Sequence, residues 1–99
     1  MAVEIRFAES AVADLEDLAS WYAEQGAGEV GVRLVAAILD RVERLAEHPD
    51  MGRMVPEFGQ PALREIIHPP SRIVYRRDPN AVRVVRVWRG ERLLRLADD

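Results

Sequence analysis

The 99-residue chain contains no cysteine and no lysine. The absence of cysteine excludes disulfides and thiol chemistry and is typical of proteins in a reducing compartment, so we expect a cytoplasmic protein. All fourteen basic residues are arginine, which indicates a compositional bias. The number of arginines, taken alone, is therefore weak support for phosphate binding.

Long apolar runs are also absent. No stretch reaches the roughly 18 consecutive apolar residues that a membrane-spanning helix needs, so the sequence predicts no membrane partner. The first residues carry Glu4 and Arg6 where a signal peptide requires an apolar core, and this pattern argues against export. A chain of this length fits one domain, which we assign to residues 1–99.

Charge is distributed unevenly along the chain. Residues 1–50 hold four arginines and eleven acidic residues, a net charge of −7, whereas residues 51–99 hold ten arginines and six acidic residues, a net charge of +4. A basic surface attracts nucleic acid or an acidic protein segment. The sequence therefore predicts that the second half of the chain carries the binding surface.

Hydrophobic periodicity predicts one strand followed by two helices. Residues 3–7 alternate with the period of two that is typical of a strand, and residues 9–25 and 29–47 place apolar side chains at helical spacing. The loop between the helices is so short that they become antiparallel neighbours. Pro49 ends the second helix, and residues 49–61 are predicted to be an irregular connection.

Three short strands complete the predicted fold, at residues 63–67, 72–77 and 82–88. Strands that are separated by such short turns pair in antiparallel fashion. The fold class is therefore α+β: an N-terminal strand, an antiparallel two-helix hairpin and a three-stranded antiparallel meander, forming one sheet with the helices on one face.

The sheet face opposite the helices is the candidate working surface. Strict alternation in the last strand places residues 83, 85, 87 and 89 on one face and residues 82, 84, 86 and 88 on the other. Because arginine occurs in both sets, the pattern alone does not decide which set points away from the helices.

Four segments of the chain together carry a family resemblance. They are AVADLEDLASWY (11–22), LAEHPDMG (45–52), LREII with RIVYR (63–67 and 72–76), and VVRVWRGER (84–92). In this order and spacing they resemble the RelE/ParE superfamily of bacterial type II toxin–antitoxin systems. The helical hairpin, the His-Pro-x-x-Gly turn and the arginine of LREII are more similar to the ParE branch.

The resemblance implies a binding protein: the toxin of a plasmid-stabilization module that inhibits DNA gyrase and is neutralised by a cognate ParD-like antitoxin. The contact surface would consist of the arginine-rich strands and the segment 89–97. An acidic, amphipathic antitoxin segment would meet the basic sheet face and an apolar groove beside the helices.

Arginine side chains can make bidentate contacts to carboxylate or phosphate, and tryptophan is a frequent anchor of interfaces. The candidate residues for binding the target or the antitoxin are Trp21, Arg64, Arg72, Arg76, Arg83, Arg86, Trp88, Arg89 and Arg92.

The RelE branch implies a different activity, a ribosome-dependent mRNA endonuclease. Metal-independent RNA cleavage needs a base for the 2′-hydroxyl group, an acid for the leaving oxygen and cations for the phosphorane, of which arginine supplies only the cations. The candidates for this alternative are Arg64, Arg72 and Tyr75. The other acid–base groups are Glu65, His68 and Glu91.

Each of these residues also has a structural interpretation. Tyr75 suits packing between strands, His68 suits a turn, and some arginines can pair with Glu65 or Glu91. A third alternative is an inactive relative that only binds its antitoxin. Direct binding of nucleic acid is left open by the sequence.

Metal and cofactor sites are not predicted. His48 and His68 are isolated, and without cysteine they give no zinc-ligand spacing. The glycines at 26 and 28 follow a helix rather than a strand, so they do not form a phosphate-binding loop. We therefore expect no cofactor.

Overall fold

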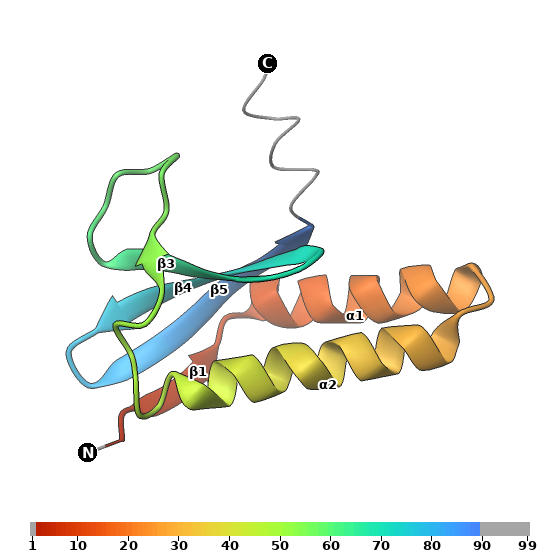
Figure 1. Cartoon of the computed structure of the whole chain (residues 1–99), viewed down its shortest axis with the longest axis horizontal. Coiled ribbons are helices and arrows are strands. Elements are labelled where there is room, and N and C mark those ends of the chain that lie inside the picture. Colours follow the sequence, from red (N-terminus) through yellow and green to blue (C-terminus); the bar gives the residue numbers. More distant parts are fainter. Residues whose placement is uncertain (1, 90–99) are drawn as a thin grey trace.

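The computed structural model describes residues 2–89, which form two helices and one mixed sheet (Figure 1). The elements are β1 (Glu4–Phe7), α1 (Glu9–Glu24), α2 (Gly28–Arg44), β2 (Arg53–Met54), β3 (Leu63–His68), β4 (Ser71–Asp78) and β5 (Ala81–Arg89). The helices form an antiparallel hairpin on one face of the sheet, which confirms the predicted α+β class.

The sheet differs from the predicted meander in two respects. Its strand order is β1-β5-β4-β3-β2, and β1 pairs with β5 in parallel, the two strands being joined by the helical hairpin and the strands β2 to β4. The second difference is β2, a two-residue strand inside the segment 49–61 that was predicted to be irregular. A strand this short has no periodicity to detect.

A β-bulge in β5 breaks the strict alternation that the sequence predicted. Val74 pairs with Arg86, whereas the next residue, Tyr75, pairs with Val84, so Val85 is the extra residue. From this point the face of each side chain is shifted by one position. The prediction that 87 and 89 share a face with 83 was therefore wrong, because Val87 lies in the core.

The core lies between the helical hairpin and the facing side of the sheet. Its buried members are Ala11, Leu18, Ile38, Val42 and Leu45 from the helical half and Ile66, Ile73, Tyr75, Val82, Val84 and Val87 from the sheet. Close approach of the helices depends on Gly31, where an added Cβ would lie 2.8 Å from the Cβ of Tyr22.

The outer edge of β5 is closed by two different elements. β1 covers the first half, up to the pair of Phe7 with Val84. Beyond this point the hydroxyl of Ser10 donates to the carbonyl of Val85 at 2.6 Å, and the carboxylate of Asp14 accepts from the backbone N–H of Val87 at 2.8 Å. Side chains of α1 therefore satisfy the part of the edge that β1 does not reach.

Candidate interaction surface

The side chains that point away from the helices form three rows across the sheet. The strand register aligns Ile67, Arg72 and Trp88 in the first row, Glu65, Val74 and Arg86 in the second, and Leu63, Arg76, Arg83 and Arg6 in the third. Five of the predicted binding residues thus share this outer face: Arg72, Arg76, Arg83, Arg86 and Trp88.

Arg72 is already occupied by two carboxylates of its own chain. Its Nε donates to Glu65 at 2.6 Å, and its two terminal nitrogens donate to Glu57 at 2.8 and 3.0 Å. Glu65 also accepts from Arg53 at 2.6 Å. The side chains of Glu65 and Arg72 are only 0% and 10% exposed, so these charges are paired inside the protein.

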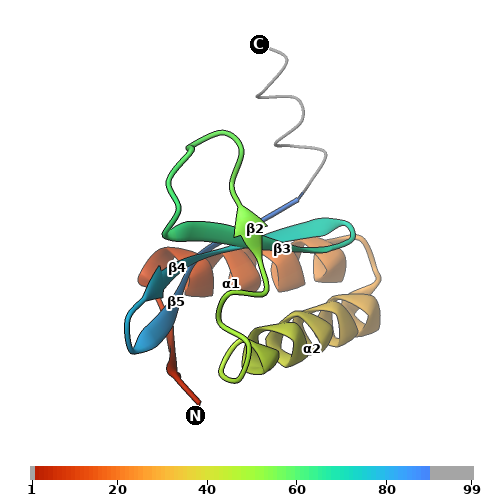
Figure 2. The ribbon, with the colours of Figure 1, turned by 60° about the vertical axis from the view of Figure 1, so that its left-hand side comes forward.

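Glu57 belongs to the connection between β2 and β3, which rises from the sheet face opposite the helices (Figure 2). Hydrogen bonding to Arg72 is the main reason why the pKa of Glu57 falls from 4.5 to about 2. The pairing covers the middle of the outer face, where Val74 is buried. Arg72 is consequently not available to a second molecule.

This ion pair predicts a pH-dependent contribution to stability. Because the folded-state pKa of Glu57 is depressed, its contribution is present above about pH 4.5 and is lost as the pH falls toward 2. We expect Glu57→Gln to lower the free energy of unfolding by about 1 kcal/mol at neutral pH, a value reduced by solvent screening. Urea denaturation across this pH range measures the difference between variant and wild type, which should shrink on acidification. A constant difference, or an equal effect of exposed Glu47→Gln, contradicts this assignment.

Arg64 and Tyr75 lie on the other side of the sheet from Arg72. They are aligned partners on β3 and β4, and both contact the turn that follows α2. The Tyr75 hydroxyl donates to the carbonyl of Pro49 at 2.8 Å and accepts from the N–H of Gly52 at 2.9 Å, while Arg64 donates to the carbonyl of Gly52 at 2.9 Å. The three nuclease candidates are therefore not brought together on one accessible face.

Tyr75 is fully buried, and burial raises the pKa of its hydroxyl. Gly52 fits beneath it because an added Cβ would lie 2.7 Å from the Tyr75 hydroxyl oxygen and 2.6 Å from the carbonyl oxygen of Glu65. These contacts dock the His-Pro-x-x-Gly turn against the sheet. Among the other acid–base candidates, Glu65 is paired with Arg72 and Arg53, and His68 is the last residue of β3. Glu91 lies outside the described residues.

Tyr75→Phe tests this structural role. We expect the variant to lose about 1–3 kcal/mol of unfolding free energy, because the buried N–H of Gly52 would be left without an acceptor. Its activity per folded molecule should remain that of wild type. Tyr22→Phe is the matched control, since no hydrogen bond of its hydroxyl exists in the described residues. Loss of activity without loss of stability would instead assign Tyr75 to chemistry.

The two tryptophans lie in different places. Trp88 is on the outer face, with the guanidinium carbon of Arg86 4.9 Å from its ring centroid, and Arg86 itself donates to Asp14 at 2.8 and 3.0 Å. Trp21 on α1 is 41% exposed and has the guanidinium carbon of Arg89 4.7 Å from its ring centroid. Arg92 and positions 90–97 of the predicted contact segment lie outside the described residues.

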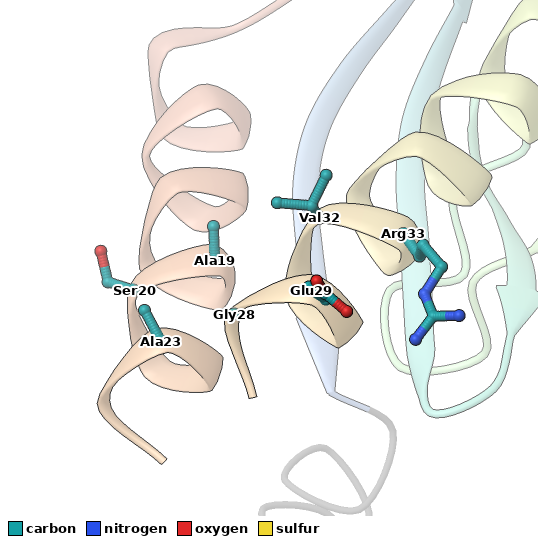
Figure 3. Close-up of a pocket in the computed structure, with 7 residues that line it drawn as sticks. All are labelled: Ala19, Ser20, Ala23, Gly28, Glu29, Val32 and Arg33. Atoms are coloured by element: carbon teal, nitrogen blue, oxygen red, sulfur yellow. The ribbon is translucent and has the colours of Figure 1, made fainter. Parts of the chain in front are cut away.

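The helical hairpin carries an apolar groove on its side away from the sheet. The groove has a volume of about 740 Å³, and Ala19 and Ala23 of α1 and Val32 of α2 lie on its two sides (Figure 3). Val32 is 67% exposed, and Leu39, seven residues later on the same helical face, is 38% exposed. The sequence predicted a groove beside the helices but did not indicate which residues line it.

Among residues 2–89, neither helix is long and apolar enough to cross a membrane. The same part of the chain has no group of three or more histidine or acidic residues that could hold a metal ion.

The arrangement of hairpin and mixed sheet is that of the RelE/ParE-like toxins. The chromosomal ParDE toxin–antitoxin system of P. aeruginosa superimposes with a TM-score of 0.75 at 20% identity, covering 89% of this chain and 96% of that one. The RelBE2 toxin–antitoxin complex of Mycobacterium tuberculosis gives 0.69 at 20% identity, covering 90% and 99%. A mutant of E. coli toxin RelE in the free state gives 0.65 at 20% identity, covering 98% and 93%.

Sequence comparison then separates the two branches. A family model described as the ParE toxin of the type II toxin–antitoxin system parDE matches residues 5–94. The chain therefore belongs to the ParE toxin family, and the predicted superfamily and branch are confirmed. No curated protein sequence matches it.

Proposed function

We propose that this ParE-type toxin inhibits DNA gyrase by binding and is kept inactive by a cognate antitoxin of the ParD type. A binding mechanism is supported by the burial and the ion pairing of the acid–base candidates. Tyr75 is buried beneath the turn at Gly52, and Glu65 and Arg72 neutralise each other. Arg64 and Tyr75 lie on the opposite side of the sheet from Arg72, so the three nuclease candidates do not share one accessible face.

The antitoxin site that fits best is the groove on the helical hairpin. Its apolar walls suit one face of an amphipathic segment, which is a common mode of peptide recognition. Arg33 and Glu29 both lie at the edge of the groove, and of the two Arg33 can give an acidic segment a charged contact. Such a contact accelerates association at low ionic strength, so we expect the association rate to fall as salt is added.

A comparison of two valines tests the groove. We expect Val32→Asp to weaken antitoxin binding at least about tenfold, because the exposed valine would lose its apolar contacts and a carboxylate would be desolvated. Val30→Asp is the matched control, since Val30 is also exposed on α2 but does not line the groove. Isothermal titration calorimetry measures both affinities. Equal affinities of the two variants would exclude this site.

The proposed activity is tested by two assays on the same toxin. Purified toxin is added to gyrase supercoiling and cleavage reactions, and mRNA ends are mapped in cells that express the toxin alone. Stabilised gyrase–DNA cleavage complexes with intact transcripts are the expected result. Cut transcripts with normal supercoiling would favour the RelE-like nuclease, and absence of growth arrest would favour an inactive antitoxin-binding relative. Tyr75→Phe, corrected for its folded fraction, should behave as wild type in both assays.

A further inference from the structure

Three arginines stand in line across neighbouring strands at one end of the outer face. Arg6 on β1 is aligned with Arg83 on β5, which is aligned in turn with Arg76 on β4. Directly opposite residues of an antiparallel pair, such as Arg76 and Arg83, have Cβ atoms about 4.5–5.5 Å apart. All three residues are exposed, and the connection that covers Arg72 does not bury them.

This alignment costs stability unless an anion offsets it, since like charges directly opposite each other destabilise a sheet. Arg6 is partly compensated by Glu4 at 2.8 Å, in a pair of which both side chains are about 60% exposed. Neither Arg76 nor Arg83 has an ion pair or a side-chain hydrogen bond within residues 2–89.

The other described arginines of β3, β4 and β5 are already engaged. Arg64 donates to the backbone of the turn after α2, Arg72 and Arg86 form carboxylate pairs, and Arg77 pairs with Asp50 at 3.0 Å. Arg89 has its contact with Trp21. The aligned pair Arg76 and Arg83 is thus the part of the basic sheet that remains for an external anion.

We propose that Arg76 and Arg83 clamp one backbone phosphate of duplex DNA. Arg6 would extend this contact along the DNA strand. Guanidinium groups bind phosphate through two parallel hydrogen bonds, and two aligned guanidinium groups can hold different oxygens of one phosphate. Contacts to the backbone position a protein on DNA without reading its sequence. This inference rests on the proposed function, because the target enzyme acts on DNA, but the binding measurement does not need gyrase.

Fluorescence anisotropy with a labelled duplex of arbitrary sequence tests the clamp. Arg83→Glu places a carboxylate between Arg6 and Arg76, so its melting temperature should equal or exceed that of wild type while its duplex affinity falls at least about tenfold. Exposed Arg44→Gln, on the last turn of α2, is the control and should bind the duplex as wild type does.

The salt dependence tests whether the two arginines share a phosphate. Each neutralised phosphate contributes about 0.9 to the slope of log affinity against log salt concentration. The double variant Arg76→Gln/Arg83→Gln should therefore lower that slope by about one. A reduction of about two would assign each arginine its own phosphate and overturn the clamp.

Two further results would overturn the proposal. One is unchanged duplex affinity of Arg83→Glu. The other is a wild-type toxin that does not bind the duplex, together with an Arg83→Glu variant that loses affinity for the antitoxin, because the row would then recognise an acidic peptide.

If wild type binds the duplex but leaves gyrase active, only the proposed function fails. If wild type inhibits gyrase without binding the duplex, only the phosphate clamp fails.

Discussion

The buried carboxylate of Glu65 constrains the outer face of this protein more than any other group. A carboxylate with no solvent exposure is tolerated only when cations and hydrogen-bond donors surround it, and here Arg53 and Arg72 supply both. Arg72 in turn requires Glu57, which holds the connection between β2 and β3 over the sheet. The middle of the face is thereby closed, and a partner can reach only its periphery.

The two surfaces that we propose for partners lie on opposite layers of the molecule. The apolar groove is on the helical hairpin, and the arginine row is on the strands, with the core between them. Figure 2 shows this separation, with the hairpin below the sheet and the covering connection above it. The polarity of charge along the chain follows the same division, since the acidic first half builds the hairpin and the basic second half builds most of the sheet.

The sequence predicted the helices, the three long strands and the family, because these depend on periodicity and on ordered motifs. It did not predict β2, the parallel pairing of β1 or the bulge at Val85, which depend on contacts between distant segments. The same limit applies to the site. Arg72 and Arg76 are equivalent by alternation, and only the position of Glu57 in space makes one of them buried and the other exposed.

Among the strands of residues 2–89, β5 is the longest, with nine residues, and an unpaired strand of that length readily recruits another chain. One of its edges is taken by β4, and the other is divided between β1 and the side chains of Ser10 and Asp14. Strand addition at this edge would have to displace β1 and the start of α1. In the folded protein, β1 and the start of α1 therefore protect β5 against self-assembly by strand addition.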